Sequence, residues 1–200
     1  MKDLVLLVAD KDAHFALKGA LERPTALGIR PITFEFRVHV GHDGGVRTTG
    51  PEVLAMEHRR FSHALLAMDF EGCGSNRDAT TLEAQLDARL FATWQDRAKA
   101  LVIEPEVDVW MWGSDNAIRE VVGWPLDGSI REWLFSEGFQ FQSNDKPMSP
   151  KDALHAVWRK ANQQRSSALY QEIASRISLR KCTDAAFQRL RQQLVVWFPQ

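Results

Sequence analysis

LVLLVADKDAHFALKGALER, residues 4–23, is the stretch that decides the fold class. Its first six residues are a continuous apolar run rich in leucine and valine, which is typical of a strand covered on both faces. Asp10 ends the run. Apolar residues at 13, 16, 17, 20 and 21 then follow helical spacing, with Asp12 as the expected N-cap and Pro24 beyond the expected end. This order predicts a sheet with helices on its faces.

The alternation of strand and helix continues to about residue 105. Strands are expected at 32–40, where the apolar residues alternate as in an edge strand, and at 63–68 and 99–105. Helices are expected at 52–61 and 78–97, and the glycine-rich stretch 41–50 is expected to be a loop. After residue 106 only helical patterns follow, around 114–122, 127–137, 150–163, 166–178 and 183–196. We predict an α/β fold with a three-layer, mainly parallel sheet at 1–113 and a helical C-terminal region, 114–200, packed on it.

The composition is that of a globular chain, with 44% hydrophobic and 26% charged residues. The apolar run at the N-terminus is short and has acids on both sides, so it is expected to be neither a signal peptide nor a membrane span. Cys73 and Cys182 lie far apart without metal-ligand or redox spacing, and they are expected to be free thiols in a reducing cytoplasm.

Charge is distributed unevenly along the chain. The net charge is −1, which by itself argues against a general nucleic-acid binder. Residues 151–200 contain nine basic and three acidic residues, a net +6, whereas 1–150 contain 16 basic and 23 acidic residues, a net −7. This asymmetry suits a cation site in the body and an anionic polymer on the C-terminal helices, although an ordinary solvated helical face would give the same pattern.

Acidic residues follow three of the predicted strands: Asp10, then Asp69 with Glu71, then Glu104 with Glu106. The carboxyl ends of parallel strands meet at one edge of a sheet, where ligands of α/β proteins bind. Crowded carboxylates raise one another's pKa unless a cation neutralises them, and Mg²⁺ or Mn²⁺ prefers such oxygen ligands. Each acid taken singly has another interpretation, as a helix cap or a solvated turn, so the prediction of a metal site depends on their convergence.

Other motifs are weaker. The glycines of GHDGG, residues 41–45, form neither a Walker loop nor a dinucleotide fingerprint, and there is no GxSxG nucleophile motif. His39, His42 and Asp43 could ligate a transition metal, but a turn is the favoured interpretation. The run Trp110-Met111-Trp112 is expected to be core, with an aromatic platform for bases as the minority alternative.

With its acids placed in this way, the chain resembles the TOPRIM domain, the metal-binding α/β module of topoisomerases, primases and overcoming-lysogenization-type nucleases. Asp10 in "LLVADKDAHFALKGAL" corresponds to the acid after the family's first strand, and Asp69 and Glu71 in "LLAMDFEG" correspond to its D-x-D motif. A bacterial TOPRIM-like group of unknown function, often met near phage-defence genes, is more similar still. Its H-E-F-E-like element looks like "VIEPEVDVWMW", and its tail looks like "SSALYQEIASRISLRKCTDAAFQRLRQQL". Asp10 replaces a glutamate of the pattern, Glu71 an aspartate and Ile103 a histidine.

The resemblance implies a Mg²⁺- or Mn²⁺-dependent nuclease or phosphodiesterase of an anti-phage defence system. Asp10, Asp69 and Glu71 would be catalytic and would bind the metal together with Glu104 and Glu106. Contacts with nucleic acid are expected from basic residues and one histidine: Lys11, His14, Arg159, Lys160, Arg165, Arg180 and Lys181. Partner proteins of the defence system and an oligomer are also expected. Two alternatives stay open: an interaction subunit that has lost catalysis, and an α/β enzyme acting on a small phosphorylated metabolite.

Overall fold

The structure, a computed structural model, describes residues 1–200 and has a four-stranded, all-parallel sheet at its centre. The strands are β1 (Lys2–Val8), β2 (Phe34–Val38), β3 (Phe61–Asp69) and β4 (Ala98–Ile103), in the spatial order β2-β1-β3-β4. The predicted three-layer α/β fold is therefore confirmed, and the alternating segment 32–40 does form an edge strand.

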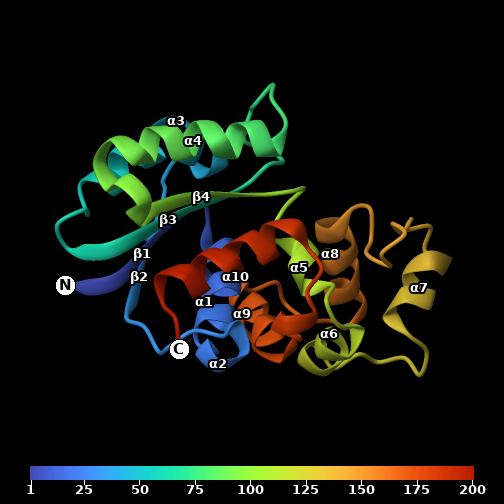
Figure 1. Cartoon of the computed structure of the whole chain (residues 1–200). Coiled ribbons are helices and arrows are strands. Elements are labelled where there is room, and N and C mark those ends of the chain that lie inside the picture. The colour runs from blue at the N-terminus through green and yellow to red at the C-terminus, as the bar shows by residue number, and fades with distance from the viewer.

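Helices cover both faces of the sheet (Figure 1). On one face lie α3 (His42–Ala55) and α4 (Ala79–Trp94), and on the other α1 (Lys11–Leu21), α2 (Pro24–Leu27) and the C-terminal helices. The C-terminal helices are α5 (Asp108–Met111), α6 (Asp115–Val122), α7 (Ile130–Ser136), α8 (Pro150–Lys160), α9 (Ser167–Arg176) and α10 (Ala185–Trp197). Short 3₁₀ turns occur at Gln95–Arg97 and Leu179–Lys181. No helix is both long enough and apolar enough to cross a lipid bilayer.

The two faces have separate hydrophobic clusters, of 18 buried residues under α3 and α4 and of 40 on the opposite side. The larger cluster joins β1 and α1 to α8, α9 and α10, so both parts of the chain contribute to it. The division at residue 113 stays a prediction. Trp110, Met111 and Trp112 are buried in this cluster, as the core interpretation predicted. Both cysteines are free thiols.

The glycine-rich stretch 41–50 was wrongly predicted to be a loop, because it forms most of α3. Close packing explains its glycines: a Cβ on Gly45 would lie 2.3 Å from Nδ1 of His39. Pro51 lies inside the helix, and the backbone oxygen of Arg47 instead accepts a 2.8 Å hydrogen bond from Arg89 of α4. The helix α3 therefore continues through these glycines and the proline.

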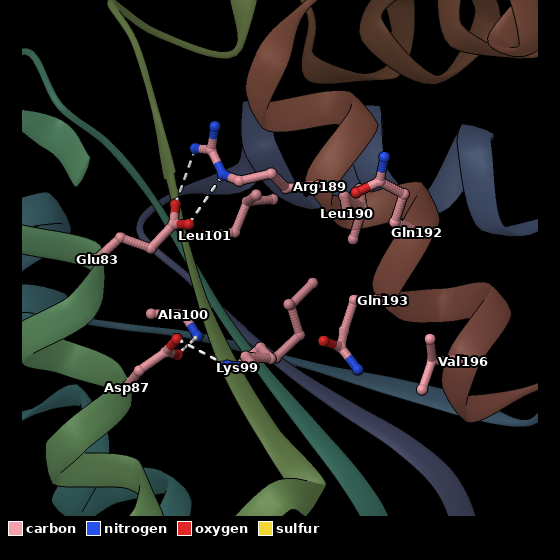
Figure 2. Close-up of a pocket in the computed structure, with 11 residues that line it drawn as sticks. Glu83, Asp87, Lys99, Ala100, Leu101, Arg189, Leu190, Gln192, Gln193 and Val196 are labelled. Atoms are coloured by element: carbon pink, nitrogen blue, oxygen red, sulfur yellow. Dashed lines mark hydrogen bonds and ion pairs between the residues drawn. The ribbon is translucent and has the colours of Figure 1, made fainter.

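Side chains close the outer edge of β4, as Figure 2 shows. Asp87 Oδ1 accepts from the Ala100 N–H at 2.7 Å, and Glu83 Oε2 accepts from the Val102 N–H at 2.9 Å. Arg189 of α10 forms two bonds to Glu83, at 2.8 and 2.9 Å. Glu83 and Asp87 thus accept the backbone hydrogen bonds of β4 that a fifth strand would otherwise accept.

Candidate functional site

The carboxyl ends of β1, β3 and β4 open onto one pocket with a volume of about 470 Å³, which we call the acidic pocket. Its charged lining consists of six acids and one lysine: Asp10, Asp43, Asp69, Glu71, Glu106, Asp152 and Lys151. Among the acids that follow strands, Asp10 and Glu106 are 96 residues apart in sequence, and they meet because parallel strands end together. The convergence predicted from the sequence is present for Asp10, Asp69, Glu71 and Glu106.

Asp69 lies at the centre of this arrangement. It is the last residue of β3, and its side chain is 7% exposed. Its Oδ1 accepts a 2.9 Å hydrogen bond from the Val107 N–H, whereas Oδ2 accepts none. The Asp69 N–H in turn donates to Asp43 Oδ1 at 2.8 Å, so the first turn of α3 is tied to the end of β3. One oxygen of a buried carboxylate is thus left without a partner at the wall of the pocket.

The electrostatics of the acidic pocket are unfavourable for bare carboxylates. Burial raises the pKa of Asp69 well above its ordinary value, and the neighbouring charges of Asp43, Asp108 and Asp10 raise it further. Burial also raises the pKa of Asp43, with Asp10 adding to the shift. A cation in the pocket would relieve both the repulsion and the loss of hydration.

Asp10 and Glu71 reach the pocket from the start of α1 and from the turn after β3. Asp10 caps α1, with its Oδ1 accepting from the Ala13 N–H at 2.9 Å, so the prediction of Asp12 as the cap was wrong. The exposed Glu71 follows β3, and Gly72 next to it has φ +80°. A positive φ favours glycine, and Gly74 has one as well, at +71°. A tight turn therefore follows Asp69, and the Glu71 side chain on it is exposed and forms no hydrogen bond.

Glu106 is held by Lys151 at the start of α8. Its Oε1 accepts from the Lys151 N–H at 3.2 Å, and its Oε2 lies 3.1 Å from Lys151 Nζ. Burial raises the pKa of Glu106, and the charge of Lys151 offsets part of that shift. Burial lowers the pKa of Lys151, but Glu106 and Asp108 outweigh it, so the net shift is upward and the ammonium stays charged. Lys151 thus supplies the one positive charge at the wall of this pocket.

Behind Glu106, the buried Asp108 adds a further acid. Burial raises its pKa to about 7, although the Tyr170 hydroxyl opposes this by donating a 2.6 Å hydrogen bond to Oδ1. The pKa of Tyr170 is raised in turn by burial and by Asp108. The Asp108–Tyr170 pair fixes α5 against α9 and adds negative potential beneath Asp69.

A second hollow, with a volume of about 560 Å³, adjoins the acidic pocket and shares Asp10 with it. Its other polar lining includes Lys11, Asp12, His39, His42, Arg165 and Ser167. Asp12 is already paired, with Arg165 Nη2 at 2.7 Å and with the Ser167 hydroxyl at 2.5 Å. Lys11 makes neither a hydrogen bond nor an ion pair, so its ammonium remains available to an anion in this hollow.

The histidines of the hollow differ in their freedom. Gly41 N–H donates to His39 Nδ1 at 3.0 Å, which leaves the proton on Nε2, 2.9 Å from Thr49 Oγ1. His39 therefore holds the start of α3 and is committed to that task. His42 is exposed, and its imidazole forms no hydrogen bond. The transition-metal alternative for His39, His42 and Asp43 stays untested.

The other predicted site residues lie elsewhere. Glu104 is exposed and does not line the acidic pocket. His14 stacks on Phe36 with the ring centroids 4.1 Å apart, and it lines neither hollow. Arg159 and Lys160 end α8, about 14 Å along the helix from Lys151. Arg180 donates to the Thr25 carbonyl at 3.1 Å and, like its neighbour Lys181, does not line either hollow.

Three charged residues of the acidic pocket were not predicted to belong to it: Asp43, Lys151 and Asp152. Asp43 was not predicted because its glycine neighbours favour a loop, whereas it lies in the first turn of α3. Lys151 follows Pro150 at the start of α8, and nothing in its sequence surroundings indicates which strand end that helix reaches. Only the three-dimensional packing of α8 on α5 brings Lys151 to Glu106.

The acids fit a hard divalent cation by their chemistry more than by their present positions. No group of three or more His, Cys, Asp or Glu side chains is arranged as a ready-made metal site. Asp69 Oδ2 is nevertheless unpartnered, Asp10 Oδ2 accepts no hydrogen bond, and the exposed Glu71 side chain forms none. The donor set is oxygen alone, which suits Mg²⁺ or Mn²⁺ better than zinc.

Comparisons of the chain with protein-family models, with curated proteins and with solved structures found no match. The resemblance to TOPRIM domains consequently depends on the sequence motifs alone.

Proposed function

We propose that the chain is a TOPRIM-like, Mg²⁺- or Mn²⁺-dependent enzyme that cleaves phosphodiester bonds, acting in anti-phage defence. The observation that carries this proposal is the state of Asp69. Its buried carboxylate has one free oxygen and forms no ion pair, and its pKa is raised by burial and by the neighbouring charges of Asp43 and Asp10. Burying such a carboxylate lowers the stability of the fold, and a bound cation would offset that loss.

The residues of the acidic pocket then divide the work. Asp69, Asp10 and Asp43 would hold the ion, and Glu71 would swing in from the turn after β3. A bound Mg²⁺ or Mn²⁺ polarises a phosphoryl oxygen and lowers the pKa of its bound water. Lys151, kept protonated by Glu106 and Asp108, would stabilise negative charge that develops on the phosphate.

The adjoining hollow supports a polymeric substrate over a small metabolite. It continues from the acidic pocket through Asp10 and offers the unpaired ammonium of Lys11. Because the two hollows share Asp10, one phosphate would occupy the acidic pocket while the next contacts Lys11 and Arg165. Arg159, Lys160, Arg180 and Lys181 lie farther away, and we assign them at most to longer-range attraction of the backbone.

The decisive experiment combines metal-dependent melting with cleavage. The full chain is heated with EDTA, Mg²⁺ or Mn²⁺, and it is incubated with plasmid and single-stranded DNA and RNA under the same conditions. We expect the metal to raise the melting temperature of the wild type, because a ligand that binds only the native state must stabilise it. Asp69→Asn and Asp10→Asn should lose both the shift and the cleavage, whereas Asp87→Asn, outside the pocket, should retain both. Activity that persists in both pocket variants would refute the site.

The second candidate is a TOPRIM-like interaction subunit of a defence complex that has lost catalysis. The observation favouring it is the occupation of Glu106 by Lys151, which takes one expected ligand away from a metal. This candidate predicts no cleavage of any substrate, no effect of divalent cations on melting, and co-purification with the product of a neighbouring gene. A third outcome, hydrolysis of nucleotides without cleavage of polymers, would point to a small phosphorylated substrate.

We place this activity in the cytoplasm. Cys73 is buried and Cys182 is half-buried, and both are free thiols, as suits a reducing compartment.

A further inference from the structure

We propose that two copies of this chain pair through β2, so that their sheets join edge to edge in antiparallel orientation. This inference does not depend on the proposed enzymatic activity. It rests on the open edge of β2, on the contrast with β4, and on the self-complementary sequence of the strand.

The outer edge of β2 has no partner within the chain. β2 pairs with β1 alone, and Leu4 N–H donates to the Thr33 carbonyl while His39 N–H donates to the Val8 carbonyl. In a parallel ladder alternate residues point to the same side, so the odd-numbered residues of this segment face β1. The N–H groups of Phe34, Phe36 and Val38 therefore point outward, and none donates a hydrogen bond.

The two edges of the sheet differ in how they are protected. Along β4 the outward N–H groups of Ala100 and Val102 are capped by Asp87 and Glu83. Along β2 the only cap is on a carbonyl, where Arg37 Nη1 donates to its neighbour Phe36 at 3.0 Å. The backbone donors that would pair with another strand are thus free on β2 alone.

An antiparallel pair centred on Phe36 satisfies these groups. Phe36 then lies opposite Phe36 of the second copy, and Phe34 lies opposite its Val38. Each of these is a position whose N–H and C=O point outward, so the pair forms about six hydrogen bonds between the strands. Val38, at present 44% exposed, is covered in the process.

Charge selects this register among its neighbours. With Phe36 at the centre, Glu35 of one copy lies directly opposite Arg37 of the other, twice by symmetry. A shift that centres the pair on Glu35 places two glutamates opposite each other, and a shift to Arg37 places two arginines opposite each other. Opposite charges across a strand pair stabilise it and like charges destabilise it, so the five residues FEFRV favour a copy of themselves.

The test begins with the mass of the full-length chain in solution, measured by light scattering over a wide range of concentrations. We expect a dimer, and Val38→Pro should weaken it by about 100-fold, because two of the inter-strand donors disappear and the ring obstructs the approach. The Val38 N–H has no partner within the chain, so the fold and the melting temperature of the monomer should change little. Val38→Thr, which keeps the N–H, should remain dimeric. A wild-type monomer at all concentrations, or a dimer unaffected by Val38→Pro, would overturn the proposal.

Charge exchange tests the register. Glu35→Lys should dissociate the dimer by placing a lysine opposite Arg37, and the double variant with Glu35→Lys and Arg37→Glu should restore it. Both variants lose contacts to Lys2 or Glu57 within the chain, so melting temperature reports that loss separately. Equal dissociation of the single and double variants would rule out the Phe36-centred register.

Discussion

Two groups of carboxylates surround this sheet, and they are treated in opposite ways. At the edge of β4, Glu83 and Asp87 each accept a backbone N–H and pair with a basic side chain, Arg189 or Lys99. At the carboxyl end of β3, Asp69 accepts one backbone N–H and has no basic partner, while further acids crowd around it. The first group is fully engaged in holding the fold. The second group has a carboxylate oxygen without a partner, on Asp69, which is the property expected of a ligand site.

The difference teaches that the number of acids alone does not identify a site. Figure 2 shows an acidic and basic cluster in a pocket of its own, yet its charges are matched between α4, β4 and α10. In the acidic pocket six acids face one lysine, and that lysine is paired with Glu106.

The largest expected effect is on activity. Asp69→Asn should lower the rate of metal-dependent phosphodiester cleavage by about 10³-fold, because an amide is a poor ligand for Mg²⁺ and carries no charge. Glu83→Gln, the matched change in the other group, should leave the rate within about threefold, because it touches no substrate. Initial rates with a fluorescent oligonucleotide under saturating Mg²⁺ measure both. Equal losses in the two variants would remove the distinction between the groups.

Stability should show the reverse ranking. Glu83→Ala leaves the Val102 N–H without its acceptor and Arg189 without its partner, so the free energy of unfolding should fall by about 2 kcal/mol. Denaturation with urea measures this loss, and an unchanged slope of the transition would show that the unfolded state is not affected. A loss below about 0.5 kcal/mol would mean that water replaces Glu83 at the edge of β4 without difficulty.

The parallel sheet and four acids of the acidic pocket could be predicted from the sequence. The apolar strands and the helix-length segments between them predict the parallel sheet, and a parallel sheet brings Asp10, Asp69, Glu71 and Glu106 together. Local apolar patterns and one rule of sheet topology are sufficient for both predictions.

The remaining parts depend on contacts between distant segments. Gly44 and Gly45 favour a loop by intrinsic preference, but His39 packs where a side chain on Gly45 would be, and the segment is helical. The pairing of Glu83 with Arg189 joins residues 106 positions apart, and the reach of α8 to Glu106 is equally non-local. The helical periodicity of the sequence does not indicate either contact.

Without a divalent cation, removing charge from the pocket should stabilise the fold. The pKa of Asp69 is raised in the folded state, so its ionisation costs little below its ordinary value of 3.8 and costs more as the pH rises through the folded value. Asp69→Asn keeps the acceptor for Val107 and should raise the free energy of unfolding at pH 8 in EDTA.

The pH dependence supplies the control for that effect. The gain from Asp69→Asn should vanish near pH 4, where the wild-type carboxyl is protonated, and it should become a loss in Mg²⁺ at pH 8, where only the wild type binds the ion. Thermal melts at both pH values, with and without Mg²⁺, cover the four conditions. A gain that is independent of pH would show that charge at Asp69 is not its cause.

The smallest expected effect concerns Asp87. Asp87→Asn keeps an oxygen for the Ala100 N–H and removes only the attraction to Lys99, whose side chain is 43% exposed. Exposed ion pairs contribute little, so the free energy of unfolding should fall by about 0.5 kcal/mol at low salt and by less at high salt. Because the same acid-to-amide change stabilises the fold at Asp69 and weakens it slightly at Asp87, the sign of the effect distinguishes a crowded carboxylate from a paired one. A stabilising Asp87→Asn would mean that the acids of α4 also lack sufficient positive charge, and the two groups would then differ only in degree.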